Sequence, residues 1–237
     1  MKEKGLKDEH ELQSYFVRRI EIILAAKGRK LIGWDEILEG GLAPGAAVMS
    51  WRGEDGGIQA AKAGHRVVMT PGSHCYFDHY QSKSTGEPLA IGGFTPLEKV
   101  YQYEPVPKAL SASESKFVMG AQANLWTEYI KTPQHAEYMA YPRVCALAEV
   151  LWTMPEKKSP GDFYTRLTRH FLLLDKWNVN YSRAFFEIKS EIKSGTGNAP
   201  LYLELKQRSS EGQIFYTTDG ADPREKEIGR ASCRERV

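Results

Sequence analysis

Four short apolar segments place the strongest constraint on the fold of this 237-residue chain. They are Lys30–Gly33, Ala46–Ser50, Arg66–Thr70 and Phe117–Ala121. Each segment is continuously apolar or rich in β-branched residues and Met, without the alternation of a half-exposed strand. This pattern is typical of strands that are buried on both faces of a parallel sheet. Helical segments separate the four, so the sequence predicts an α/β fold.

Local signals define the first of these helices. Asp8 and Glu11 have the spacing of a capping box, and the helix that they begin is expected to end at Gly28. Apolar residues recur along it at helical spacing, which predicts an amphipathic helix. The residues of this apolar stripe are Leu12, Phe16, Ile20, Ile23 and Leu24.

Three further helices are expected before residue 155. Gly53–Gly57 should open a helix that runs through Ala63, and Pro96–Tyr101 is a short candidate. Thr132 and Pro133 form an N-cap and first-turn pair, and Pro142 should kink or divide the helix that follows.

About four strand–helix units are therefore visible, whereas a complete (β/α)₈ barrel contains eight. We predict that residues 1–188 form the C-terminal half of a TIM (β/α)₈ barrel, with the helix Phe163–Trp177 packed on its outside.

The sequence changes character after about residue 190. SGTGNAP reads as a linker, LYLEL alternates apolar and polar residues, and QIFYTTDG ends in an Asp-Gly turn signal. Residues 189–226 are therefore predicted to be a linker and a truncated small antiparallel β element. The last segment, EIGRASCRERV, continues neither pattern, and residues 227–237 are interpreted as a non-native tail.

Composition excludes several classes of partner. The formal charge is only +2 and no basic run is dense, so nucleic acid is not an expected partner. No apolar run approaches the roughly 18 to 20 residues that span a bilayer. Three scattered cysteines form neither a disulfide framework nor a zinc site, and no metal or cofactor is expected. The N-terminal segment lacks the pattern of a signal peptide, and compartment and oligomeric state stay open.

Candidate site residues follow the predicted strands. The active sites of β/α barrels lie at the carboxyl ends of their strands. Here those ends carry Trp34-Asp35-Glu36, Trp51, Tyr76 to Asp78, and Trp126 to Glu128. A sugar ring presents apolar C–H faces, on which indole rings stack. It also presents hydroxyl groups, which donate hydrogen bonds to carboxylates. These residues therefore indicate a carbohydrate pocket.

Structural interpretations compete with this one. Each Trp could pack in the core, Asp35 and Glu36 could cap the next helix, and Glu54 and Asp55 are expected to do so. Arg143 and Glu149 are interpreted as structural ion-pair or capping residues. A metal is not expected at four residues that superficially resemble ligands, because their spacing fits no known motif. They are His74, Cys75, Asp78 and His79.

Five segments together resemble the β-N-acetylhexosaminidases of glycoside hydrolase family 20. They are GWDEILEGGLAP, AAVMSWRG, VVMTPGSHCYFDHYQ, GAQANLWTEYI and AEYMAYPRVCALAEVLWT, and the resemblance runs from about residue 6 to about residue 185. GQIFYTTDGADP resembles the start of the β-domain that follows this barrel in bacterial members. The resemblance implies a β-N-acetylhexosaminide substrate, a periplasmic or secreted protein, and a retaining mechanism in which the substrate's acetamido oxygen is the nucleophile.

The resemblance also implies a role for each site residue. Tyr76 is the catalytic residue that should hydrogen-bond and orient the acetamido oxygen. Trp34 and Trp51 should form walls of the acetamido pocket, and Trp126 should stack under the sugar ring. Asp78 and Glu128 should bind its C4 and C6 hydroxyl groups.

One catalytic group is expected to lie upstream of residue 1. The family's adjacent Asp-Glu pair, which contains the general acid, follows an earlier strand than the one that ends at Trp34, so Asp35-Glu36 is not assigned this role. We therefore expect a chain that is inactive alone, and unpaired strand edges that favour association or aggregation. A non-catalytic sugar-binding fragment is the alternative. An unrelated barrel enzyme that uses phosphate or a metal is a third hypothesis, but no glycine-rich loop or ligand cluster supports it.

Overall fold

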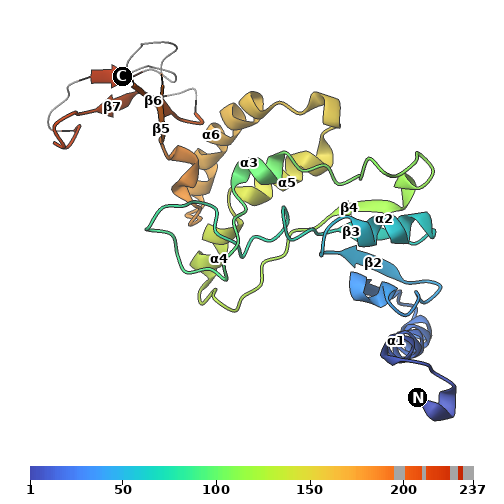
Figure 1. The fold of residues 1–237 in the computed structure, drawn as a ribbon. Coiled ribbons are helices and arrows are strands. Elements are labelled where there is room, and N and C mark those ends of the chain that lie inside the picture. The colour runs from blue at the N-terminus through green and yellow to red at the C-terminus, as the bar shows by residue number, and fades with distance from the viewer. Residues whose placement is uncertain (195–200, 210–211, 225–228, 232–237) are drawn as a thin grey trace. The chain divides into compact units, whose positions relative to one another are not determined.

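A computed structural model describes residues 1–194, 201–209, 212–224 and 229–231 of the chain (Figure 1). The chain divides into two compact units, Met1–Lys157 and Lys158–Val237, which are described separately. Among the helices of the described residues, none is both long and apolar enough to cross a bilayer.

The first unit contains a parallel sheet in which all four predicted strands are present. They are β1 (Ile32–Trp34), β2 (Ala47–Ser50), β3 (Val67–Met69) and β4 (Val118–Ala121), in the order β1-β2-β3-β4. In the register of the sheet, Trp34 lies opposite Met49, and Ser50 lies opposite Met69. The predicted α/β class with a parallel sheet is confirmed.

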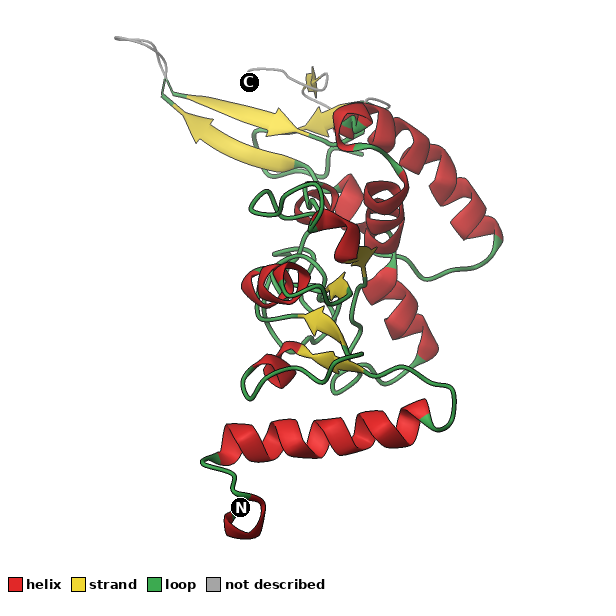
Figure 2. Cartoon of the chain, turned by 90° about the vertical axis from the view of Figure 1, so that its right-hand side faces the viewer, coloured by secondary structure: helices red, strands yellow, loops and turns green. Residues whose placement is uncertain are grey.

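Helices alternate with these strands (Figures 1 and 2). The α-helices of this unit are α1 (Glu9–Ala25), α2 (Asp55–Lys62), α3 (Leu97–Tyr101), α4 (Pro133–Ala140) and α5 (Arg143–Trp152). Short 3₁₀ turns are η1 (Lys2–Lys4), η2 (Asp35–Leu38), η3 (Ser115–Phe117) and η4 (Pro155–Lys157). Thr132 caps α4 by accepting a hydrogen bond from the backbone N–H of His135, and Pro142 separates α4 from α5, as predicted.

The core of this unit lies where α2 packs against the central strands. Its buried residues are Val48, Ala60, Ala61, Val67, Met69, Cys75 and Tyr103. Gly57 faces Met69 so closely that a Cβ atom there would lie 2.6 Å from the sulfur, so any larger residue at this point of α2 would force the buried Met69 side chain to move. The edge strands are less buried than predicted, since Ile32 on β1 and Met119 on β4 are about half exposed.

A β-bulge shifts the register between β3 and β4. Val67 pairs with Val118, but Val68 pairs with Gly120, so Met119 is the extra residue. Gly120 has a φ of 136°, which an L side chain rarely adopts. Bulges bend a strand and redirect its end, and this one precedes the segment that carries Asn124 and Trp126.

Helix α1 begins as predicted, because the Asp8 carboxylate accepts a hydrogen bond of 2.9 Å from the Glu11 N–H. Its apolar stripe, however, does not face the rest of the unit: Phe16 is 63% exposed and Ile23 57% exposed. The opposite face makes the contacts, through Ser14, which donates to the Gly41 carbonyl, and Glu21, which accepts from the Gly45 N–H. The sequence pattern predicts an apolar face but not what it packs against.

The described residues of the second unit form α6 (Pro160–Lys176), the 3₁₀ turn η5 (Arg183–Phe186) and four strands. Aromatic packing joins the first two elements, since the Phe171 ring stacks on Tyr181 at 4.6 Å and contacts Phe185 at 5.2 Å. The strands form two antiparallel pairs, β5 (Lys189–Lys193) with β6 (Tyr202–Lys206) and β7 (Ile214–Tyr216) with β8 (Gly229–Ala231).

The predicted antiparallel β element is thus present, but its two segments pair with other strands instead of with each other. Most of the predicted linker SGTGNAP lies outside the described residues. The strand β8 falls within the segment interpreted as a non-native tail. The predicted division of the chain at residue 188, the non-native tail and the packing of α6 on a barrel stay predictions.

Candidate functional site

Backbone pairing continues beyond the ends of the strands and brings the predicted site segments together. The Gly72 N–H donates to the Trp51 carbonyl at 2.9 Å, which joins the ends of β2 and β3. The Phe77 N–H donates to the Asn124 carbonyl and the Asn124 N–H to the Cys75 carbonyl, both at 2.7 Å. These bonds place Trp51, Tyr76 and Trp126 on adjacent segments.

Four of the predicted residues contribute aromatic rings to this region. The rings of Trp34 and Trp126 lie 5.7 Å apart, and those of Trp51 and Tyr76 lie 6.3 Å apart. The side chains of Trp126 and Asn124 lie close enough to the Tyr76 hydroxyl to lower its pKa, which links the two pairs. The structure therefore gathers aromatic residues from all four strand ends. Asn124 is a contributor that the sequence pattern did not reveal.

The Tyr76 hydroxyl lies in an environment that keeps it protonated. Burial raises its pKa, the polar side-chain groups of Trp126 and Asn124 lower it, and the nearby charges of Asp78 and Asp35 raise it again, with a net increase. A phenol whose pKa is raised remains a neutral hydrogen-bond donor across the physiological range.

Asp78 is buried, with 5% of its surface exposed, and carries an unpaired oxygen. Within the described residues, its Oδ1 atom has no hydrogen-bond partner. Burial raises the pKa of this carboxyl group, and the charge of Glu128 raises it further. Its own backbone N–H lowers the pKa, and so does the charge of Arg143. Glu128 itself is exposed on the loop after β4. An unpaired buried carboxylate oxygen is a strong acceptor for a ligand hydroxyl group.

Asp35 and Glu36 do not cap a helix with their side chains, contrary to one of the interpretations above. The Asp35 carboxylate is buried and accepts from the backbone N–H groups of Trp51 and Arg52, at 3.0 and 3.2 Å, and from the Arg52 Nε at 2.6 Å. The Glu36 Oε1 accepts from the indole N–H of Trp51 at 2.9 Å. Both residues therefore fix the position of Trp51.

The cap of α2 also differs from the sequence prediction. Glu54 occupies the N-cap position but makes no side-chain cap hydrogen bond, and Asp55 is the first residue of the helix. Ser50 takes over this role, because its hydroxyl accepts from the Gly57 N–H at 2.9 Å and donates to the Gly53 carbonyl at 2.8 Å. The same residue ends β2, so it couples the strand end to the helix.

The residues that superficially resemble metal ligands have other partners. The His74 ring stacks on Tyr103 at 4.9 Å, Cys75 lies in the core, and the His79 Nδ1 lies 3.0 Å from the Thr95 hydroxyl. Across the described ranges, His, Cys, Asp and Glu side chains form no group of three or more that could hold a metal ion.

Arg143 is neither an ion-pair nor a capping residue of the expected kind. Its side chain is fully buried and donates to the backbone carbonyls of Phe77, His79, Thr95 and Met139. The guanidinium also lies over the Phe77 ring, 4.9 Å from the centroid. The sequence signal that favours such burial is a mainly apolar helix, RVCALAEVLW, in which Glu149 is the only other charged residue. Glu149 accepts a hydrogen bond from the Tyr101 hydroxyl.

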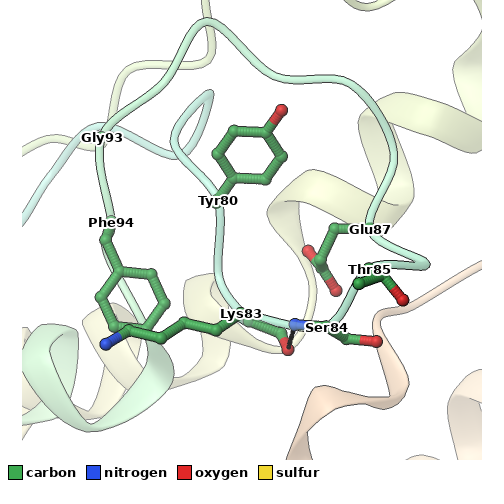
Figure 3. Close-up of a pocket in the computed structure, with 8 residues that line it drawn as sticks. Tyr80, Lys83, Ser84, Thr85, Glu87, Gly93 and Phe94 are labelled. Carbon is green, nitrogen blue, oxygen red and sulfur yellow. Dashed lines mark hydrogen bonds between the residues drawn. The ribbon is translucent and has the colours of Figure 1, made fainter.

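The loop that follows Asp78 lines a separate pocket of about 430 Å³ that is open to solvent (Figure 3). The Tyr80 ring points into it, and Lys83 extends along the Phe94 ring with its Nζ 5.4 Å from the centroid. The Glu87 carboxylate, also in the lining, accepts from the Tyr138 hydroxyl at 2.6 Å. None of the six predicted site residues lines this pocket.

Comparison with known proteins places this arrangement in context. The model of the glycosyl hydrolase family 20 catalytic domain matches residues 1–155. A β-hexosaminidase of Porphyromonas gingivalis is 58% identical over 182 residues, which are 76% of this chain and 23% of that protein. A β-hexosaminidase of Vibrio furnissii is 34% identical over 62% of this chain and 25% of its own length. The chain thus spans about a quarter of these relatives.

A solved structure shows the same fold. The family 20 exo-β-N-acetylglucosaminidase from Vibrio harveyi, in complex with N-acetylglucosamine, aligns with a TM-score of 0.70 and 32% identity. The alignment covers 78% of this chain and 29% of that one. This likeness confirms the predicted part of a (β/α)₈ barrel.

Proposed function

Because the chain belongs to glycosyl hydrolase family 20, we propose that it supplies the sugar-recognition side of an enzyme that removes terminal β-linked N-acetylhexosamine. The substrate class is a non-reducing β-GlcNAc or β-GalNAc residue. One observation carries the proposal: four aromatic rings from four strand ends meet beside a buried carboxylate with an unpaired oxygen. The names of the relatives from Porphyromonas and Vibrio support the same class of substrate.

The proposed chemistry is retaining and assisted by the substrate, one of the exceptions to the two-carboxylate scheme. The sugar's acetamido oxygen attacks the anomeric carbon while the bond to the leaving oxygen breaks and that oxygen takes a proton from a general acid. An oxazolinium ion forms, and water then opens it with retention of configuration. Tyr76, held neutral by its surroundings, donates a hydrogen bond that orients the acetamido oxygen.

The remaining residues bind the sugar ring. Trp34 and Trp51 enclose the acetamido group, and Trp126 provides a face for the apolar side of the ring. Asp78 and Glu128 accept hydrogen bonds from the C4 and C6 hydroxyl groups. The unpaired Oδ1 of Asp78 is the acceptor that supports this assignment most directly.

We propose that residues 1–237 alone do not turn over substrate, because the general acid is supplied from sequence outside this range. The Asp35-Glu36 pair does not fit the role. Asp35 is held by two backbone N–H groups and Arg52, and the Glu36 Oε1 accepts from the Trp51 indole, so both residues are engaged in positioning Trp51.

Two measurements on the 237-residue chain test these proposals. Titration with GlcNAc should give a saturable change in Trp fluorescence, and a chromogenic β-GlcNAc substrate should not be hydrolysed. Absence of saturable binding would contradict the sugar-recognition role. Robust hydrolysis would contradict the missing acid while supporting the substrate class.

Matched variants make the titration specific. Tyr76→Phe and Asp78→Asn should each weaken GlcNAc binding by about tenfold, the value of one hydrogen bond to a buried or charged group. Trp152→Phe is the control, since that ring is 91% exposed and lies outside the site, so the affinity should not change. Equal affinities in all four proteins would place any sugar binding elsewhere.

A further inference from the structure

The guanidinium of Arg143 is buried beside the segment of Asp78, a proposed sugar ligand with an unpaired carboxylate oxygen. Its Nη2 donates to the Phe77 carbonyl at 2.5 Å, and its Nη1 donates to the His79 carbonyl at 3.0 Å. These two carbonyls belong to the residues on either side of Asp78. The segment Phe77–His79 is therefore held at both ends by a single side chain.

The same guanidinium ties this segment to two other parts of the unit. Nη1 also donates to the Thr95 carbonyl at 3.0 Å, and both Nε and Nη2 donate to the Met139 carbonyl in α4. Arginine is suited to this task because its planar fork presents five N–H donors in fixed directions. Lysine at this position could supply only three donors from one atom.

A structural ion pair would place a carboxylate against the guanidinium, but the contacts here are with carbonyl oxygens and with the Phe77 ring. The positive charge is consequently not neutralised by a bonded partner and acts on the carboxylates around it. Those that face it are Asp78 and Glu87. The charge of Arg143 lowers the pKa of Asp78, against burial and the charge of Glu128, which raise it.

We propose that Arg143 is a positioning residue that holds the Phe77–His79 segment so that the Asp78 carboxylate faces the sugar in its charged form. This inference rests on the proposed function. Arg143 does not touch the substrate: it acts through the backbone on both sides of Asp78 and through its charge.

Two substitutions separate the two effects. Arg143→Gln removes the charge but retains amide N–H donors, and Arg143→Lys retains the charge but loses part of the fork. The readout is GlcNAc affinity of the 237-residue chain as a function of pH. In the wild type, affinity should fall on acidification as Asp78 is protonated. In Arg143→Gln, affinity at pH 7 should fall about tenfold and the midpoint of the acid loss should move to higher pH.

Other titrating groups lie near Asp78 and Arg143. Glu128 and Tyr76 face Asp78, and Glu87 and Tyr138 face Arg143. The charges of Arg143 and Lys99 lower the pKa of His79. Only Asp78 is both a proposed sugar ligand and an acid whose pKa Arg143 lowers. Arg143→Lys should therefore keep the wild-type midpoint and recover part of the affinity.

The possible outcomes distinguish failure of the proposed function from failure of the positioning role. Lack of GlcNAc binding by the wild type would overturn the proposed function and this inference with it. Wild-type binding combined with an unshifted midpoint, or with equal affinity loss in both variants, would overturn this inference alone. If neither variant unfolds cooperatively, Phe77→Leu replaces them, because it loosens the packing under the guanidinium without removing its donors. Unchanged affinity in Phe77→Leu would then refute the positioning role, and weakened affinity would support it.

Discussion

The carboxylate of Asp35 is expected to stabilise the unit mainly as an acceptor for backbone N–H groups. It is 1% exposed, and Asp35→Ala would leave the N–H groups of Trp51 and Arg52 without their acceptor. Each such loss costs roughly 1 to 3 kcal/mol, and since both donors are only partly buried the lower end applies to each. The ion pair with Arg52, whose side chain is 45% exposed, adds at most about 1 kcal/mol. The expected destabilisation by Asp35→Ala is therefore about 3 kcal/mol.

Two matched variants divide this value. Asp35→Asn keeps a carbonyl oxygen for the backbone donors and should cost about 1 kcal/mol. Arg52→Met removes the exposed ion pairs with Asp35 and Glu39 but leaves the backbone donors paired, so it should also cost about 1 kcal/mol. Urea unfolding followed by Trp fluorescence measures all three. The reasoning is refuted if Asp35→Ala lies within 1 kcal/mol of the wild type, or if Arg52→Met is as destabilising as Asp35→Ala. GlcNAc titration of the same proteins should show the largest loss for Asp35→Ala, because Trp51 is then less fixed.

Three further predictions follow from burial and exposure. Because the folded-state pKa of Asp78 is raised, the free energy of unfolding falls as pH rises above the ordinary carboxyl pKa of about 3.9. Asp78→Asn removes this ionisation, so it should be more stable than the wild type at pH 7, by on the order of 1 kcal/mol, but not near pH 3. Urea titrations at both pH values measure this, and equal stability at pH 7 would contradict it. Burial raises the pKa of Cys75 to about 12, so a thiol reagent should modify this residue only upon unfolding; rapid labelling of the native protein, located by peptide mapping, would contradict this. The exposed Phe16 and Ile23 of α1 should promote self-association of the chain. The double variant Phe16→Asp, Ile23→Glu should therefore have a lower mass by light scattering after size-exclusion chromatography. An unchanged mass would show that this face of α1 does not mediate association.

The strands of the first unit and the starts of α1 and α4 could be predicted because their causes are local. Continuous apolar runs such as AVMS and RVVMT have no polar face, so they require burial on both sides wherever they lie. The capping hydrogen bond of Asp8 joins residues three positions apart, and that of Thr132 does the same. Nearest-neighbour chemistry was sufficient in these cases.

Burial could not be predicted in the same way. The stripe on α1 has a clear helical period, yet the polar Ser14 and Glu21 make the contacts with the loop that ends at Gly45. Periodicity identifies which residues share a face, but which face is covered depends on residues elsewhere in the chain. Met119 illustrates the same limit, because the bulge that turns it outward is visible only in the pairing of β4 with β3.

The sequence by itself determined which residues stand at the ends of the strands, and hence that Trp34, Trp51, Tyr76 and Trp126 could share one edge of a sheet. Only the tertiary structure decided what holds them there. The Glu36 contact with Trp51 spans 15 residues and that of Arg143 with the Phe77 carbonyl spans 66. The partner of a buried polar group is chosen by which unsatisfied atoms the folded chain brings within about 3 Å, and no sequence spacing encodes that distance.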